Sequence, residues 1–126
     1  MSRPDYTRVL LKVSGEALAG DQSYGIEPEF LNDVARQIVD VTRKGVQVAI
    51  VIGGGNIFRG MAVAAKGGDR VIGDHMGMLG TVINSLALGD AIRRAGGKSH
   101  VFSSVTMPSI ADTFTQRGAI AALEGG

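Results

Sequence analysis

The sequence predicts an α/β fold, an αβα sandwich in which helices cover a largely parallel sheet. Two short runs rich in β-branched residues, 8–14 and 46–52, have the composition of buried strands. Between them, residues 30–41 repeat apolar side chains at helical spacing. A strand, a helix and a strand in this order form a βαβ unit. The two strands are therefore expected to be parallel, with a right-handed crossover.

The bulk composition is that of one globular domain. The chain has 126 residues, of which 44% are hydrophobic and 20% charged, enough for a core and unlike a disordered segment. A net charge of +1 offers little attraction to nucleic acid or to an anionic membrane. The sequence shows no cysteine, no signal-peptide pattern and no apolar run of membrane-spanning length.

The first strand, 8–14, leads into a turn at Gly15. Lys12 interrupts this apolar run, and a buried ammonium group is costly unless an anion pairs with it. At the end of the strand, Lys12 would project into the crevice beside the next strand's turn. The alternative is an edge-strand lysine whose amine reaches solvent.

A polar loop, 20–25, precedes the crossover helix, which opens at Glu27 and Pro28. Proline suits the first helical position, and acidic residues suit the positive end of the helix dipole. Gly45 is expected to close the helix. The apolar side chains expected to face the core are Phe30, Leu31, Val34, Ile38 and Val41.

The second strand ends in three consecutive glycines, Gly53, Gly54 and Gly55. Such a turn can approach a ligand closely and adopt positive φ values, and its successive N–H groups can form an anion-binding nest. Arg59, four residues later, can direct two N–H donors onto a phosphate. Open α/β sheets bind ligands at the carboxyl ends of strands, so these residues predict a phosphate site. The alternative is an ordinary glycine turn beside a surface arginine.

A short helix is expected at 57–65 and a long helix at 69–94. The middle of the long helix is apolar on nearly all sides, which is typical of a helix buried in a core or at a subunit interface. Near its start, His75 is interpreted as a partly buried histidine rather than a catalytic base. Four glycines in helical positions suggest a close approach or a kink near a ligand: Gly73, Gly77, Gly80 and Gly89.

The last third predicts a strand at 99–103 and a helix at 115–123 with Ile120 and Leu123 facing inward. The chain then reaches Gly125 and Gly126, a turn that would feed a further strand. The fold is therefore expected to be incomplete in this chain.

Several catalytic motifs are absent. There is no G-x-x-x-x-G-K-[ST] loop, no G-x-S-x-G elbow and no H-E-x-x-H helix. Neither histidine lies at metal-ligand spacing, so no metal site built from protein side chains is expected. Phosphate handling by Lys12, residues 53–55 and Arg59 is the chemistry that the motifs support.

Three segments resemble the bacterial UMP kinases, a branch of the amino acid kinase family. They are Leu11–Leu18, Val51–Gly60 and Gly73–Leu79 with Thr81 and Val82. The first two resemble the whole family in looser form, and the third is closer to a UMP kinase signature. The resemblance covers essentially all 126 residues, but only the N-terminal, UMP-binding half of the usual enzyme.

The resemblance implies transfer of the γ-phosphoryl group of ATP to UMP, giving UDP, in pyrimidine nucleotide synthesis. It also implies Mg²⁺ carried by the nucleotide, activation by GTP, inhibition by UTP, and a cytoplasmic homohexamer. Phosphoryl transfer depends on positioning and charge neutralisation, which agrees with a lysine, an arginine and a glycine nest.

The resemblance also assigns roles residue by residue. Lys12 and Arg59 match the catalytic cations, and Gly54 and Asp74 match the UMP-binding residues, although Asp74 alone fits a helix-dipole partner. The ATP- and phosphate-binding set is Lys12, Val13, Ser14, Gly15, Gly55 and Arg59. The loop associated with GTP activation is matched by Gly20, Asp21, Gln22, Ser23, Tyr24 and Gly25.

Two other functions are compatible with these patterns. One is another amino acid kinase family member acting on a carboxylate or carbamate, against which residues 74–78 argue. The other is a non-catalytic subunit that binds a nucleotide or oxyanion on the same fold, because the family's C-terminal, ATP-binding half is absent from this chain.

Overall fold

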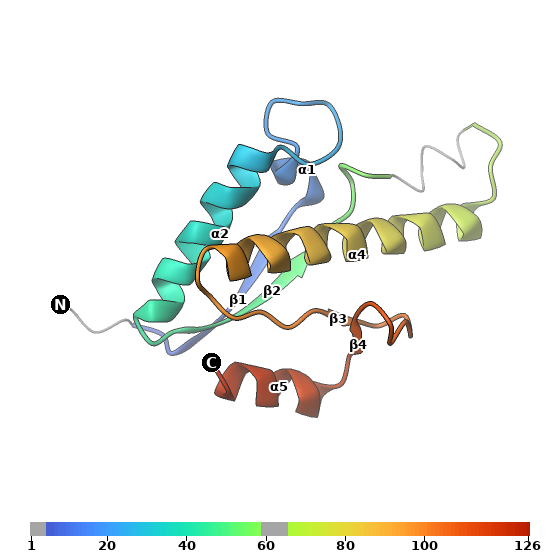
Figure 1. The fold of residues 1–126 in the computed structure, drawn as a ribbon. Coiled ribbons are helices and arrows are strands. Elements are labelled where there is room, and N and C mark those ends of the chain that lie inside the picture. The colour runs from blue at the N-terminus through green and yellow to red at the C-terminus, as the bar shows by residue number, and fades with distance from the viewer. Residues whose placement is uncertain (1–4, 59–65) are drawn as a thin grey trace.

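The computed structural model describes residues 5–58 and 66–126 (Figure 1). The helices and strands described in these ranges follow the order of the expected βαβ unit and then continue through a long helix. In chain order they are β1 (Arg8–Val13), α1 (Gly15–Leu18), α2 (Pro28–Arg43), β2 (Gln47–Ile52), α4 (Arg70–Arg94), β3 (Phe102–Ser103), β4 (Asp112–Thr113) and α5 (Gln116–Glu124).

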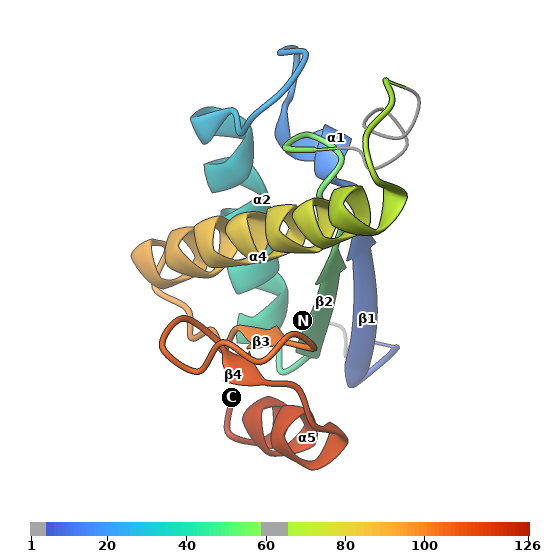
Figure 2. The ribbon, with the colours of Figure 1, turned by 90° about the vertical axis from the view of Figure 1, so that its right-hand side faces the viewer.

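The two expected strands pair as predicted. β1 and β2 are parallel and in register from Arg8 opposite Gln47 to Val13 opposite Ile52, and they lie side by side in Figure 2. Because a parallel pair needs a crossover, α2 connects them over the length of the sheet. The α/β class and the parallel sheet are confirmed.

The ends of α2 are set by local chemistry. The Glu27 carboxylate accepts a hydrogen bond from the Phe30 N–H at 2.7 Å, and Pro28 occupies the first helical position. After the helix, Gly45 adopts a φ of +89°, a conformation that a residue with a Cβ rarely tolerates. Both boundaries agree with the sequence prediction.

The buried face of α2 differs in part from the prediction. Leu31 and Ile38 are buried as expected, but Phe30 and Val41 are more than one-third exposed. The reason is that α2 packs mainly against α4, which turns a different stripe of α2 inward. That stripe joins the core cluster of Leu18, Leu31, Ala35, Ile38, Val39, Ile52, Leu88, Ala91 and Ile92.

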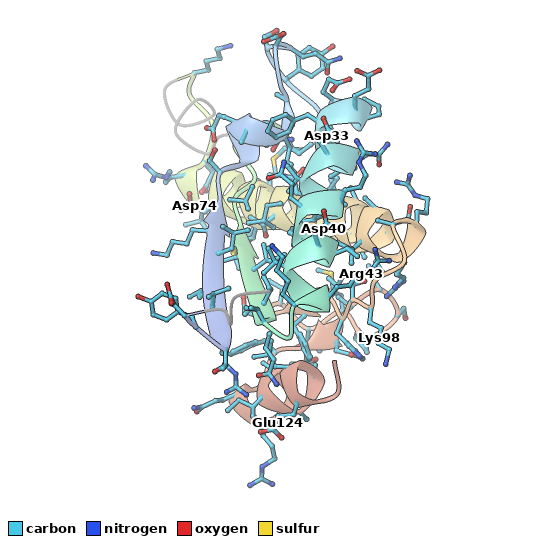
Figure 3. All side chains as sticks on the ribbon, turned by 90° about the vertical axis from the view of Figure 1, so that its left-hand side faces the viewer. Asp33, Asp40, Arg43, Asp74, Lys98 and Glu124 are labelled. Carbon is cyan, nitrogen blue, oxygen red and sulfur yellow. The ribbon has the colours of Figure 1, made fainter. Side chains whose placement is uncertain are left out.

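Charged side chains mark the opposite face of α2. Figure 3 shows Asp33, Asp40 and Arg43 on the outer side of this helix, away from the strands. The helix is therefore amphipathic in the way that a surface helix over a sheet must be.

The long helix α4 begins and ends as predicted. The Asp69 carboxylate accepts hydrogen bonds from the N–H groups of Val71 and Ile72 at 2.8 and 3.3 Å, which caps the helix. Its C-terminal part packs on α2, and its N-terminal part extends past the strands (Figures 1 and 2). Its exposed large apolar side chains are Val71, Ile72, Met76, Met78, Leu79, Ile83 and Leu86.

The prediction of a strand at 99–103 is mostly wrong. Only Phe102 and Ser103 form a strand, and they pair in parallel with Asp112 and Thr113 instead of joining β1 and β2. The Ser99 hydroxyl donates to the Gly89 carbonyl of α4 at 3.0 Å, so the start of the segment is held by a helix. A side-chain hydrogen bond of this kind competes with strand pairing.

The last helix, α5, forms where it was expected, but no residue in it is fully buried. Ile120 and Leu123, which were expected to face inward, are only half-buried. Most of the short helix expected at 57–65 falls outside the described residues. Of the described helices, none is long and apolar enough to cross a membrane.

Candidate functional site

The two predicted glycine turns meet at the carboxyl ends of β1 and β2. The Gly53 N–H donates to the Val13 carbonyl at 3.0 Å, which continues the parallel pairing by one residue. A Cβ placed on Gly15 would lie 2.6 Å from the Gly55 nitrogen and 2.9 Å from the Gly53 oxygen. Only glycine permits this approach, so Gly15 is needed for the two turns to touch.

The second turn also touches α4. A Cβ placed on Gly54 would lie 2.8 Å from both the Gly77 oxygen and the Thr81 nitrogen. On the helix side, a Cβ on Gly80 would meet the Gly54 oxygen at 3.3 Å. The expected close approach at a glycine of α4 is therefore confirmed at Gly80, and the glycine turn is held between Gly15 and α4.

The backbone of this turn leaves donors available. The Ile57 and Phe58 N–H groups donate to the Gly54 carbonyl at 2.9 and 3.0 Å, which folds the chain back. Within the described ranges, the N–H groups of Gly54 and Gly55 donate to no other residue. Two neighbouring N–H donors of this kind can bind an anionic oxygen.

A carboxylate that the sequence analysis did not single out lies beside the turn. A Cβ placed on Gly55 would come within 3.0 Å of the Glu16 carboxylate. A phosphate at Gly55 would require this carboxylate to move aside or to share a cation with the ligand, because like charges repel at this distance. The signal that could have found Glu16 is its place directly after the first glycine turn.

Lys12 lies one residue before the end of β1, opposite Val51, and its side chain is exposed. Side chains alternate along a strand, so Lys12 and Val51 point away from the core that Val13 and Ile52 contact. Among the described residues, Lys12 forms no ion pair. The exposed side chain carries no cost of burying an ammonium group, and its role toward a phosphate stays a prediction.

Asp74 lies in the second turn of α4 and bonds to Arg70, with Nε and Oδ1 3.0 Å apart. Both side chains are more than half exposed. Asp74 lies about one turn before the residues of α4 whose backbone meets Gly54. Figure 3 shows Asp74 toward the end of the molecule at which β1 ends.

His75 was expected to be partly buried and is exposed instead. The prediction was wrong because this part of α4 extends beyond the elements that could cover it (Figure 1).

The loop at 20–25 touches the site through its last residue. Gly20 and Gly25 have positive φ values of 59° and 82°, and the side chains of residues 21–24 are exposed. The Gly25 N–H donates to the Asn56 carbonyl at 2.8 Å. The loop is thus attached to the glycine turn, in a contact that the sequence analysis did not expect.

Two buried asparagines were also missed. Asn56 is 3% exposed and Asn84 is 0% exposed, and they bond to each other beneath the glycine turn. Asn84 could have been found as a polar residue in the apolar middle of α4, because buried polar groups need partners.

Arg59 lies outside the described residues, so its place at the site stays a prediction. Ser14 and Val13 precede the first turn, and the Ser14 hydroxyl accepts from the Ala17 N–H at 3.2 Å. The part of the chain that the structure describes contains no group of three or more acidic or histidine side chains that could hold a metal ion.

Residues 7–122 match the amino acid kinase family. The uridylate kinase of Bartonella bacilliformis is 57% identical over 121 residues, which make up 96% of this chain and 51% of that protein. The uridylate kinase of Xanthomonas axonopodis pv. citri is 52% identical over 126 residues, all of this chain and 52% of that protein. The chain thus spans about half the length of the curated relatives it matches.

Two solved structures share the fold. The UMP kinase from Bacillus anthracis is 37% identical with a TM-score of 0.85, and the match covers 95% of this chain and 50% of that one. The UMP kinase from Ureaplasma parvum is 32% identical with a TM-score of 0.87, and the match covers 98% of this chain and 52% of that one. Sequence and fold agree over nearly every residue, and the chain belongs to the amino acid kinase family.

Proposed function

We propose that this chain forms the phosphate-acceptor half of a UMP kinase, which transfers the γ-phosphoryl group of ATP to UMP and releases UDP. The observation that carries the proposal is the glycine turn at 53–55, held against Gly15 on one side and α4 on the other. The similarity of the chain to uridylate kinases supports the choice of UMP as acceptor.

The proposed roles are those that the resemblance to UMP kinases implies. The N–H groups of Gly54 and Gly55 bind the UMP phosphate, and Asp74 accepts hydrogen bonds from the ribose hydroxyls. Lys12 and Arg59 neutralise charge on the transferred group, which is the main task in phosphoryl transfer. Residues 13–15 form the neighbouring phosphate turn, and Mg²⁺ arrives as the ATP complex.

Regulation and assembly belong to the same proposal. Loop 20–25 is proposed to respond to GTP, with UTP as inhibitor, and the intact enzyme is proposed to be a cytoplasmic homohexamer. The attachment of Gly25 to Asn56 supports a connection between that loop and the acceptor site.

The proposed activity is tested with a full-length enzyme that contains these 126 residues. A coupled assay should detect UDP formation from UMP and ATP, with little activity on carbamate or amino acid acceptors. Preference for a carboxylate or carbamate acceptor would refute the UMP assignment and favour another branch of the family.

The 126-residue chain alone is expected to produce no steady UDP. Phosphoryl transfer needs donor and acceptor held in line, with cations around the transferred group, and the chain spans half of its relatives. Calorimetry should show marginal UMP binding and weak or absent ATP binding. Sustained UDP production by the purified chain, free of host kinases, would contradict this expectation, whereas UMP binding without turnover fits a non-catalytic binding subunit.

The exposed apolar face of α4 is proposed to contact a neighbouring subunit. Ile83 is 47% exposed and Leu79 50%, so Ile83→Lys should shift the sedimentation profile of the full-length enzyme toward smaller species. Tyr6→Lys, at a residue 71% exposed just before β1, is the matched control and should leave assembly unchanged. A wild-type monomer, or equal effects of both changes, would contradict the interface.

A further inference from the structure

The two buried asparagines form a closed pair of hydrogen bonds. The Asn56 Nδ2 donates to the Asn84 Oδ1 at 3.1 Å, and the Asn84 Nδ2 donates to the Asn56 Oδ1 at 2.7 Å. Neither side chain has an ionisable group. The pair therefore gains rigidity through bonds that change little with pH or salt.

The remaining amide hydrogens bond to two separate backbone segments. The Asn84 Nδ2 donates to the Gly53 carbonyl at 2.7 Å, and the Asn56 Nδ2 donates to the Gly25 carbonyl at 2.8 Å. Because a carbonyl can only accept, these two contacts fix which amide atom of each asparagine is nitrogen. All four amide hydrogens are then used, which is the full donor capacity of the pair.

The pair joins three parts of the fold that are distant in sequence. Asn84 lies in α4 and holds the first residue of the glycine turn, and Asn56 closes that turn. Gly25 and Asn56 are bonded in both directions, since the Gly25 N–H also donates to the Asn56 carbonyl at 2.8 Å. A change in the path of loop 20–25 is therefore expected to shift the backbone and side chain of Asn56.

We propose that Asn56 and Asn84 are positioning residues, which hold the Gly54 and Gly55 N–H groups toward the acceptor phosphate and transmit the conformation of loop 20–25 to that turn. The proposal rests on the proposed function for the identity of the ligand. It goes beyond that function in assigning the geometry of the turn to a buried amide pair that never touches the substrate.

The direct test is Asn84→Asp in a 15N-labelled full-length enzyme that contains these 126 residues. The substitution keeps the shape of the side chain and removes its two N–H donors. Titration with UMP is followed at the Gly54 and Gly55 amides, and hydrogen exchange is followed at the Gly25 amide. We expect UMP affinity to fall about tenfold or more and Gly25 exchange to rise by a similar factor. The variant loses the bond that Asn84 donates to the Gly53 carbonyl and the bond that it donates to the Asn56 Oδ1, so that Asn56 is held less firmly next to Gly25.

The matched control is Leu88→Ala, one turn later in α4, where the side chain is 3% exposed and belongs to the apolar core. This change lowers the unfolding temperature without touching the amide pair. It should leave UMP affinity and Gly25 exchange close to those of the wild-type chain, measured at the same temperature interval below unfolding.

A second variant separates the two halves of the proposal. Asn56→Asp removes the donor to Gly25 and leaves the Asn84 bond to Gly53 possible, so Gly25 exchange should rise more than UMP affinity falls. Equal responses of Asn84→Asp and Leu88→Ala would overturn the positioning role.

The outcome also distinguishes this proposal from the proposed function. If the wild-type Gly54 and Gly55 amides do not respond to UMP, the proposed ligand is wrong. Even then, the hydrogen exchange of the Gly25 amide and the chemical shifts of Gly53–Gly55 test whether the asparagine pair positions the turn. Unchanged values in both asparagine variants would refute it, and changes confined to those variants would support it.

Discussion

Arg59→Ala in a full-length enzyme that contains these residues is expected to lower turnover severely while leaving the fold intact. The substitution removes guanidinium donors that act where charge develops on the transferred phosphoryl group. Each charge-assisted hydrogen bond is worth roughly 1.5–3 kcal/mol, so turnover should fall roughly ten- to hundredfold for each bond lost. Steady-state kinetics with UMP and ATP, together with circular dichroism, measure both parts of the expectation.

Two further variants make the Arg59 result specific. Arg59→Lys keeps the charge and loses the planar fork of donors, so its turnover should fall between those of the wild type and Arg59→Ala. Arg36→Ala removes an arginine from the outer face of α2, where it pairs with Asp33, and should leave kinetics unchanged. Near-normal turnover of Arg59→Ala would remove Arg59 from the proposed site.

Gly54→Ala is expected to destabilise the fold and distort the site at once. The added Cβ would lie 2.8 Å from the Gly77 oxygen and the Thr81 nitrogen and 3.0 Å from the Gly80 carbonyl carbon. All three are backbone atoms of α4, which cannot swing aside as a flexible side chain can. Overpacking of this kind costs roughly 1–3 kcal/mol, so the unfolding temperature should fall by several degrees, and UMP binding should be lost with it.

Gly77→Ala is the matched control on the other side of the same contact. A Cβ on Gly77 meets no atom within 4 Å, and replacing a helical glycine by alanine favours the helix by up to ~1 kcal/mol. Its unfolding temperature should therefore stay level or rise. Equal destabilisation by the two substitutions would show that helix glycines, and not the turn-to-helix contact, determine the effect.

Local patterns in the sequence determined most of the βαβ unit and the long helix. The boundaries of α2 follow from Glu27, Pro28 and Gly45, and the start of α4 follows from Asp69, because caps and turn residues act within a few positions. The parallel pairing of β1 and β2 follows from the helix between them. The meeting of the turns at Gly15 and Gly53–Gly55 follows in turn, since parallel strands end at one edge of the sheet.

Long-range packing decided the features that the sequence analysis missed. The buried stripe of α2 depends on where α4 crosses it, and Ser99 bonds to α4 instead of extending a strand, because tertiary contacts override local propensity. His75 is exposed for the same reason, since its environment depends on how far the neighbouring elements reach.

The features of the candidate site also divide into those that local sequence predicts and those that long-range packing determines. The glycine turn can be located from the local sequence, but the positive φ values expected there are wrong, because none of Gly53, Gly54 and Gly55 adopts one. Glycine is required at residue 54 for a tertiary reason instead, since a Cβ there would lie 2.8 Å from backbone atoms of α4. The use of Gly54 as the contact with α4, the position of Glu16 beside Gly55 and the pairing of Asn56 with Asn84 each join residues from different elements. Only the tertiary structure could decide them, because a polar side chain takes its role from the partners that folding brings within hydrogen-bonding distance.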